Sequence, residues 1–328
     1  MALVGCASGA KTLREVEALS QDLDPVIRKG LGIQRLVPDT TLRDLLVVVD
    51  PTELRGAMIR GVKARLRGKS VKHDRAPGGV VSIDGKTTRT RLVVGPYAQR
   101  VEGATLYGLV RTLSCTLISS NAFPCLDAVP IPAETNETGH FRVAFEGLCH
   151  HYDSHFEMVM GDAAFATAAN ADLVATAGKA YTFQLKENGP TLLAEATALL
   201  SGDKVTEKRG EAEREDGRFV ARRLRIVDVN TTAQNQVVWP TARRVMSVER
   251  LHVDAHNHVV AVLGIRYFIT NQRPGRYSET QWLRTLRDRW AVENQTHGTL
   301  DIAFQEDDYP WIDEPQGMVN VTRGCQSR

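Results

Sequence analysis

Apolar positions recur at helical intervals over about the first 75 residues. The sequence Asp50-Pro51-Thr52-Glu53 offers an N-cap, a proline at the first helical position and an acidic residue at the third. Every fourth residue of the helix predicted to follow is apolar, which gives one stripe of Leu54, Met58, Val62 and Leu66. Shorter helices are predicted over residues 11–23 and 41–49. Together these patterns predict a small helical module.

A turn-rich joint at residues 75–79 precedes a region with strand periodicity. Residues 181–186 alternate between apolar and polar, which predicts a half-exposed strand. The order of strands and helices predicts an α/β core with mixed strand directions. Other strands are predicted where apolar or β-branched residues gather, over residues 80–83, 107–119, 124–132 and 156–160, with helices over residues 137–149 and 165–177.

A further stretch, residues 190–275, interrupts this α/β order. It contains a short helix over residues 191–200, a charged and exposed stretch over residues 203–215, and three strand-like segments at 219–229, 243–253 and 258–270. We interpret it as a β-rich insertion, before a last helix from residue 279 to about 296. The predicted organisation is a helical module (1–75), the first part of a core (76–189), the insertion (190–275) and the last part of the core (276–328).

The composition is that of an ordinary globular protein, with 42% hydrophobic and 24% charged residues. No apolar run is long enough to span a bilayer. The opening residues lack a charged leader before Cys6, which predicts a cytoplasmic chain without a membrane partner. The five cysteines form no C-x-x-C pair and are interpreted as unpaired thiols.

A formal net charge of +2 says little about nucleic acid, but the distribution of charge says more. From Arg55 to Lys72 the chain carries seven basic residues and no acidic one. Such a run could neutralise phosphates and release counterions, and a solvated helix face is an equally good explanation. The candidate DNA-binding residues in this run are Arg60, Lys63, Arg65 and Arg67.

Three carboxylates have the positions that a two-metal site requires. Asp84 is predicted at or near the end of a strand, Asp162 ends a buried strand, and Glu293 lies on the late helix. Mg²⁺ prefers carboxylate oxygen ligands, and two such ions can assist phosphodiester cleavage. A single aspartate at a strand end more commonly has a capping role. Glu293 also has an alternative in an i, i+4 pair with Arg289, worth about 0.3–0.5 kcal/mol.

Three segments around these acids resemble DDE-type transposases of bacterial insertion sequences, and within them the ISAs-type branch. They are residues 82–87 (SIDGKT), residues 161–163 (GDA) leading to 181–188 (YTFQLKEN), and residues 289–297 (RWAVENQTH). Weaker matches follow in the same order over residues 12–17, 38–43, 134–137, 239–240 and 300–308. The resemblance therefore covers nearly the whole chain.

The resemblance implies an RNase H-like core with a β-strand insertion before the helix that carries the third acid. Asp84, Asp162 and Glu293 match the catalytic acids that bind two Mg²⁺ ions, with Mn²⁺ able to substitute. Arg289 matches an arginine that contacts DNA beside the active site in related enzymes. Further candidates for DNA contact are Lys86, Arg89 and Lys186. Trp239 is either an aromatic that stacks on an extruded base or part of the insertion core.

The sequence departs from the family pattern at several positions. Leu286 and Leu300 occupy positions where relatives often carry tyrosine and lysine, and Gly298 replaces a tryptophan. DNA contact on that face is therefore assigned to Arg289 and His297. Residues 322–328 look unrelated to the helix that follows in relatives, which suggests a truncated or frameshifted copy.

The implied activity is transposition, in which DNA is hydrolysed at element ends and a 3′-hydroxyl then attacks target DNA. The implied partners are double-stranded DNA and a second copy of the chain, because synapsis joins two ends, in the bacterial cytoplasm at the nucleoid. Alternatives are an inactive relic that binds DNA or a full-length partner, and a nuclease without strand transfer. A zinc site lacks a standard second half, although four candidate ligands are close in sequence: Cys149, His150, His151 and His155.

Overall fold

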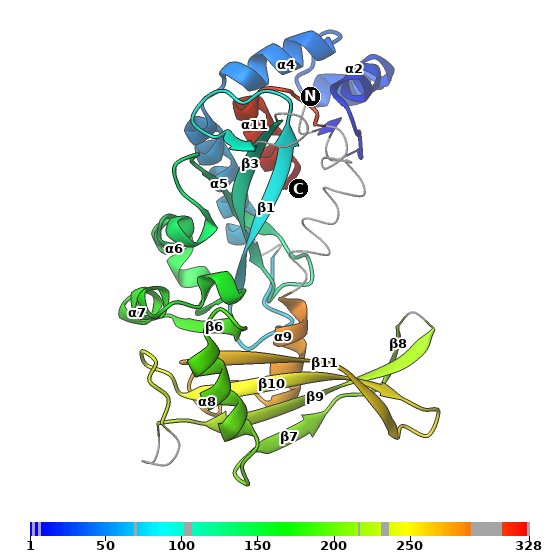
Figure 1. Cartoon of the computed structure of the whole chain (residues 1–328). Coiled ribbons are helices and arrows are strands. Elements are labelled where there is room, and N and C mark those ends of the chain that lie inside the picture. The colour runs from blue at the N-terminus through cyan, green and yellow to red at the C-terminus, as the bar shows by residue number, and fades with distance from the viewer. Residues whose placement is uncertain are drawn as a thin grey trace.

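A computed structural model describes residues 1, 4–5, 8–68, 71–101, 107–215, 217–230, 236–289 and 310–326. In this part of the chain, eleven strands form one mixed sheet, and helices lie against it (Figure 1). The strands are β1 Val80–Thr90, β2 Gln99–Val101, β3 Tyr107–Leu117, β4 Cys125–Ile131, β5 Met158–Gly161, β6 Ala180–Leu185, β7 Thr206–Arg209, β8 Glu213–Glu215, β9 Arg218–Asp228, β10 Arg244–Val253 and β11 Val259–Thr270. The helices are α2 Leu13–Asp22, α3 Pro25–Gly30, α4 Asp39–Val48, α5 Pro51–Arg67, α6 Glu137–Tyr152, α7 Ala168–Thr176, α8 Pro190–Leu200, α9 Glu279–Asp288 and α11 Pro315–Gln326.

The sheet confirms the predicted α/β class with mixed strand directions. Its order is β2-β3-β1-β5-β6-β11-β10-β9-β7, with β4 beside β3 and β8 beside β9. The pairs β1–β5 and β5–β6 are parallel and the other pairs are antiparallel. None of the helices described is both long and apolar enough to cross a membrane.

Strand β6 is buried along its whole length, so the prediction of a half-exposed strand was wrong. Its neighbours β5 and β11 occupy both edges. Phe183 packs with the aromatic rings of α6 on one face, while Gln184 accepts a hydrogen bond from Arg289 at the end of α9 on the other. Alternation of apolar and polar residues thus marked two different buried faces.

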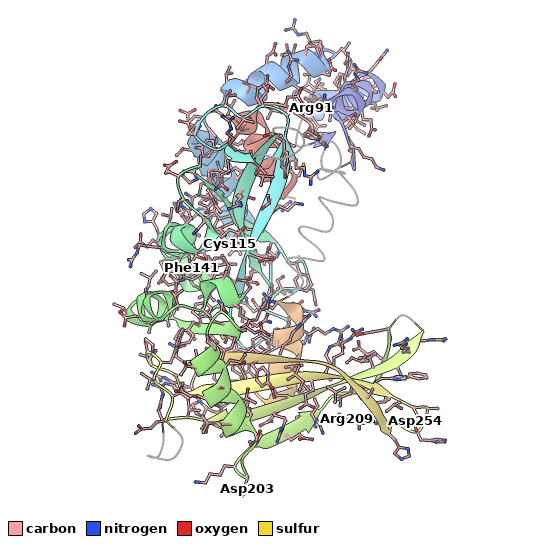
Figure 2. The ribbon with its side chains drawn as sticks, viewed as in Figure 1. Arg91, Cys115, Phe141, Asp203, Arg209 and Asp254 are labelled. Atoms are coloured by element: carbon pink, nitrogen blue, oxygen red, sulfur yellow. The ribbon has the colours of Figure 1, made fainter. Side chains whose placement is uncertain are left out.

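The segment predicted as an insertion continues the central sheet. Residues Tyr267–Thr270 of β11 pair with Leu185–Thr182 of β6, which joins β9, β10 and β11 to the core strands. Figure 2 shows Arg91 in the upper part of the view and Asp203 and Asp254 in the lower part, among the strands of this segment. The charged stretch around residues 203–215, predicted as exposed, is mostly exposed and contains the short strands β7 and β8.

Helix α5 packs on the core through part of the predicted stripe, together with Ile59, which was not predicted. Ile59, Val62 and Leu66 are buried, whereas Leu54 and Met58 are half-buried. A helix has 3.6 residues per turn, so a strict four-residue repeat drifts off the buried face. The face is extended by Arg55, whose guanidinium is partly buried and forms an ion pair with the buried Asp127 on β4.

The last described helix, α11, packs against α4 and β3. Residues 322–326 are helical and belong to α11, in which Val319, Val321 and Cys325 are buried. Arg323 is also buried, and burial lowers its pKa to about 10. Its guanidinium donates hydrogen bonds to the backbone oxygens of Ala128 and Pro51.

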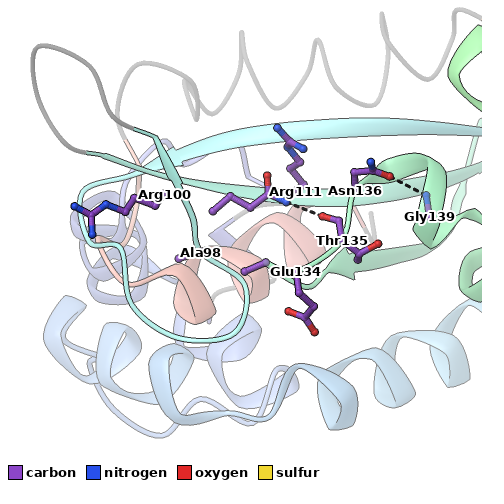
Figure 3. A pocket seen from close by; sticks show the side chains of 9 residues that line it. Ala98, Arg100, Arg111, Glu134, Thr135, Asn136 and Gly139 are labelled. Atoms are coloured by element: carbon purple, nitrogen blue, oxygen red, sulfur yellow. Dashed lines mark hydrogen bonds between the residues drawn. The ribbon is translucent and has the colours of Figure 1, made fainter.

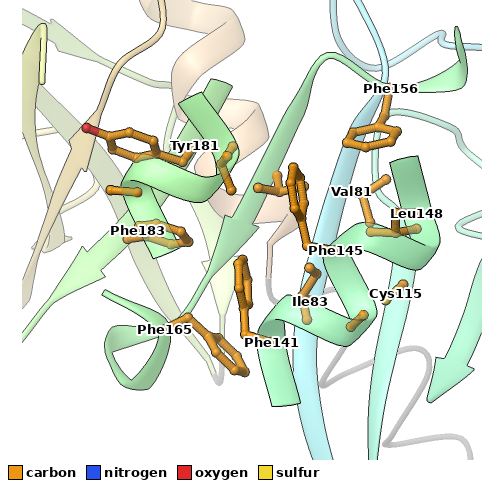
Figure 4. Packing of buried hydrophobic residues seen from close by; sticks show 14 of the residues in the cluster. Val81, Ile83, Cys115, Phe141, Phe145, Leu148, Phe156, Phe165, Tyr181 and Phe183 are labelled. Carbon is orange, nitrogen blue, oxygen red and sulfur yellow. The ribbon is translucent and has the colours of Figure 1, made fainter. Parts of the chain in front are cut away.

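Residues on alternate positions of β1 pack into two separate clusters. Val81 and Ile83 pack with Phe141 and Phe145 of α6 (Figure 4). Val80 lies in the other cluster, with Trp282 and Leu286 of α9. The sheet therefore has an α6 face and an α9 face, and the parity of a residue along β1 decides which one it meets.

Candidate active site

Asp84 and Asp162 lie at neighbouring positions on adjacent parallel strands. The last paired residues of β1 and β5 are Ile83 and Gly161, and each aspartate is the next residue along its chain. Contrary to the prediction, Asp84 is not at the end of β1. Antiparallel pairing of β1 with β3 continues to Thr90 after the pairing of β1 with β5 stops. Asp84 therefore lies at the point where β1 and β5 stop pairing. As at the end of a strand, a side chain at that point can reach solvent.

Both aspartates belong to the α9 face. Along β1, Val80 and Ser82 face α9, and Asp84 has the same parity. Along β5, Met158 and Met160 pack in the α9 cluster, and Asp162 continues that alternation with an extended backbone (φ −75°, ψ −175°). Asp162 is fixed further because its Oδ1 accepts a hydrogen bond from the Ala164 backbone N–H at 2.9 Å.

The C-terminal end of helix α9 lies near the same end of strands β1 and β5 as the two aspartates. It begins with a capping box at Ser278 and Gln281. At its other end Ser82 Oγ donates to the Arg289 carbonyl at 3.4 Å. The Arg289 guanidinium, predicted to lie on the surface, is only 3% exposed and donates to Gln184 Oε1 at 3.0 Å. A buried guanidinium requires an acceptor, and the sheet supplies one here.

Glu293 and His297 lie outside the described residues. Within the described ranges, no three or more His, Cys, Asp or Glu side chains are grouped to hold a metal ion, and this includes Cys149 and its neighbouring histidines. The chemistry of the donor set still fits a hard cation, since two carboxylates on one face of adjacent strands provide the oxygen ligands that Mg²⁺ prefers.

Glu137, at the start of α6, lies beside the backbone of Gly85, which has the parity of Val81 and Ile83 and therefore belongs to the α6 face. The sequence analysis did not select Glu137 as a site residue. A Cβ atom placed on Gly85 would lie 2.2–2.5 Å from the Glu137 carboxyl atoms, so that carboxyl group sits on the backbone just after Asp84. Burial raises the pKa of Glu137, Arg111 opposes the rise, and Asp162 adds to it. Asn136 caps α6, and Thr138 Oγ1 donates to the Ala164 carbonyl. The sequence signalled a helix start at this position and a weak resemblance to the family over residues 134–137.

The remaining DNA-binding candidates are dispersed. Lys86 is buried, and Arg89 is exposed with its guanidinium 5.1 Å from the centre of the Tyr107 ring. Lys186 is exposed just after β6. Trp239 is partly buried and packs against the α6-face cluster. On α5, Lys63 is half-buried and three arginines are exposed, namely Arg60, Arg65 and Arg67.

An open pocket of about 830 Å³ lies between the start of α6 and the β2–β3 region (Figure 3). Gln99 Nε2 donates to the Thr135 carbonyl across it, and Asn136 Oδ1 accepts from Gly139 N–H at its rim. Neither Asp84 nor Asp162 lines this pocket. It is therefore separate from the aspartate pair.

No protein-family model matches the chain, and no curated protein matches it. Among solved structures, the chain is similar to one described as a piggyBac transposase synaptic complex with hairpin DNA, with a TM-score of 0.46 and 10% sequence identity. The similarity covers 99% of this chain and 63% of that chain, so this chain spans less than two thirds of the matched protein. A similarity at this level assigns neither a family nor an activity.

Proposed function

We propose that the chain is a DDE-type DNA transposase with an RNase H-like core, which hydrolyses phosphodiester bonds at element ends and transfers strands into target DNA. The observation that carries the proposal is the pairing of β1 with β5. It sets Asp84 and Asp162 side by side on the α9 face, in the segments that resemble the family's first two acids. The third matching acid, Glu293, follows α9 by five residues.

Two Mg²⁺ ions, or Mn²⁺ in their place, would be held by Asp84, Asp162 and Glu293. When bound, such ions activate an attacking hydroxyl and stabilise the leaving oxygen of a phosphodiester. The chain's own residues supply rigidity: β1 and β5 are hydrogen bonded up to the residue before each aspartate, and Asp162 is held by the Ala164 N–H. Catalytic groups on strands of a packed sheet are placed more accurately than groups on loops.

The test is a cleavage and joining assay with Mg²⁺, using full-length protein and duplex DNA that carries the element's own flanking ends. Asp84→Asn and Asp162→Asn are the variants, because the amide preserves shape while removing the charge that a cation needs. Asp172→Asn is the matched control, since Asp172 is an exposed residue of α7 ten positions after Asp162.

We expect cleavage and joining in the wild type and in Asp172→Asn, and loss of both in the two active-site variants. Metal-dependent cleavage that survives Asp162→Asn would refute the assignment. A folded wild-type protein that binds DNA without cleaving it would instead support the inactive DNA-binding alternative. Cleavage without joining would support a nuclease.

A further inference from the structure

Strand β11 has one edge without a neighbouring strand along most of its length. Strand β10 pairs with β11 from Val259 to Thr270, whereas β6 covers the opposite edge only over Tyr267–Thr270. In the part of the chain that the structure describes, no strand pairs with this second edge at residues 259–265 (Figure 1). The edge therefore presents backbone N–H and C=O groups to which a further strand can hydrogen bond.

The side chains of this segment are apolar and exposed. Every residue from Val259 to Ile265 is exposed, and none of them is charged. The larger side chains, which are mostly β-branched, are 39–59% exposed: Val259, Val260, Val262, Leu263 and Ile265. Apolar surface on an extended strand with a bare edge favours pairing with another strand. We call residues 259–265 the open edge of β11.

The outer strands on the other side of β9 are charged. Strand β7 has the sequence TEKR and β8 the sequence ERE, and their side chains form ion pairs such as that of Glu215 with Arg222. Charged side chains protect an edge strand, because pairing with a second copy would bring like charges together. The open edge of β11 carries no such protection, so its sequence is compatible with a copy of itself.

A second copy of this chain fits the open edge better than a charged or an unstructured partner. In two-fold pairing the segment lies antiparallel to itself, and an uncharged segment does so without repulsion. Both strands are already extended in the folded sheet, so pairing costs less conformational entropy than the ordering of a loose peptide. Pairing also covers both open edges, which closes the assembly at two chains.

The size of the open edge is suited to a weak, reversible dimer. Stable interfaces bury roughly 1,200–2,000 Å² in total, and one short edge strand from each copy provides less. Bulges against β10 leave Val260 and Leu263 as extra residues on β11, which limits the length of a regular ladder. The association should therefore depend on protein concentration in the micromolar range.

We propose that residues 259–265 form a dimer interface, in which the open edges of two copies pair antiparallel and join their sheets. Strand β11 also pairs with β6, which lies beside β5 and Asp162. One continuous sheet therefore links the candidate active sites of the two copies. The interface itself does not depend on the function proposed above.

The test is sedimentation velocity of the full-length protein without DNA or metal, over about 1–200 µM, which brackets a micromolar dissociation constant. The variants are Val262→Lys and Val262→Glu, because Val262 is the middle residue of the open edge and lies at or beside the two-fold axis. Val238→Lys is the matched control, since Val238 is a 90% exposed valine between β9 and β10. Circular dichroism checks that each variant is folded.

We expect a reversible monomer–dimer equilibrium in the wild type and in Val238→Lys. Each Val262 variant alone should dimerise at least about tenfold more weakly, because like charges meet near the axis. An equimolar mixture of Val262→Lys and Val262→Glu should recover dimers, since opposite charges then face each other, and NaCl should weaken the recovery. Mere disturbance of β11 by a charged side chain predicts no recovery in the mixture.

A wild-type protein that stays monomeric over the whole range, or forms open-ended oligomers, would overturn the proposal. Dimers that neither Val262 variant weakens, or that the mixture does not restore, would also overturn it. Val262→Thr covers the case in which a charged variant does not fold. Threonine keeps the branched shape and makes the edge less apolar, so dimerisation should weaken by about two- to threefold, and unchanged dimerisation would contradict the interface.

The sedimentation result and the cleavage assay fail independently, because no DNA or metal is present during sedimentation. Absence of cleavage in the wild type would contradict the proposed function and leave the dimer interface standing. Absence of a dimer would contradict the interface and leave the assignment of Asp84 and Asp162 standing.

Discussion

Arg75 and Asp288, which are 213 positions apart in sequence, form a bidentate ion pair. Arg75 Nε lies 2.7 Å from Asp288 Oδ2, and Nη2 lies 2.7 Å from Oδ1. Asp288 is the last residue of α9, so the pair fixes that end of the helix to the joint before β1. Arg289 follows Asp288 directly. The Arg75–Asp288 ion pair and the Arg289–Gln184 hydrogen bond therefore hold the same end of α9 against the sheet.

Asp288→Asn should reduce both stability and DNA cleavage. Removing one partner of a largely buried ion pair leaves the other charge poorly compensated, which costs about 3 kcal/mol. Urea unfolding measures the stability, and cleavage is measured where the variant remains folded. The control is Arg284→Gln: Arg284 is exposed and 4.0 Å from Asp288, so its loss should cost less than about 0.5 kcal/mol. Equal effects of the two changes would contradict a special role for Arg75.

The sequence was informative about strands and helices because their periods are set by local geometry. It predicted β3, β4, α6 and β10 to within a few residues. It could not show that β11 would pair with β6, since pairing between distant strands leaves no local pattern. The same limit applies to Arg55 on α5, because its ion pair with Asp127 on β4 joins residues that are far apart in sequence.

The candidate site could likewise be predicted from sequence only in part. Asp84 and Asp162 were selected from sequence, and their neighbouring positions depend on the β1–β5 register, which only the structure gives. Glu137 and Gln184 lie in two segments that resemble the family, residues 134–137 and 181–188, but neither was selected as a site residue. A glutamate in a first helical turn and a polar residue in an alternating strand both have ordinary explanations. Glu293 and His297 stay predictions.

Phe141→Ala should strongly destabilise the protein. The Phe141 side chain is fully buried, and its ring centre lies 5.3 Å from that of Phe165 and 5.9 Å from that of Phe183. Truncation removes apolar contacts and leaves a cavity, with a cost of about 3–5 kcal/mol in urea unfolding. Val143→Ala on the same helix is the control, because Val143 is 43% exposed and should change stability by about 0.5 kcal/mol or less. Similar values for the two variants would contradict the packing in Figure 4.

Two glycine substitutions should change the stability of the protein in opposite directions. A Cβ atom on Gly79 would lie 2.0 Å from the His155 backbone oxygen and 2.6 Å from the Phe156 Cα, so Gly79→Ala forces the start of β1 away from β5 and should cost about 1–3 kcal/mol. Gly61 lies inside α5 with open space around its Cα, so Gly61→Ala should stabilise by about 0.5–1 kcal/mol through helix propensity. Melting temperatures measure both, and a rise for Gly79→Ala would contradict the close approach.

Glu215 should make stability depend on acid pH. Burial raises the pKa of this carboxyl, but hydrogen bonds from Arg222 and Arg250 outweigh burial and leave the pKa below its ordinary value. Because the folded state holds the charged form more tightly, the carboxylate stabilises the protein fully above the unfolded pKa of about 4.3. That stability is lost as the pH falls through the lower, folded pKa.

Glu215→Gln should therefore be less stable than the wild type by about 1–2 kcal/mol at neutral pH, since two charge-assisted hydrogen bonds are weakened. The difference should stay constant down to about pH 4.3 and then narrow as the wild-type carboxyl takes up its proton. Urea unfolding at a series of pH values measures it. Glu211→Gln, at an exposed position in the same region, should show a much smaller difference across the range. A gap between Glu215→Gln and the wild type that widens toward acid would mean that the two arginines do not stabilise the charged carboxylate.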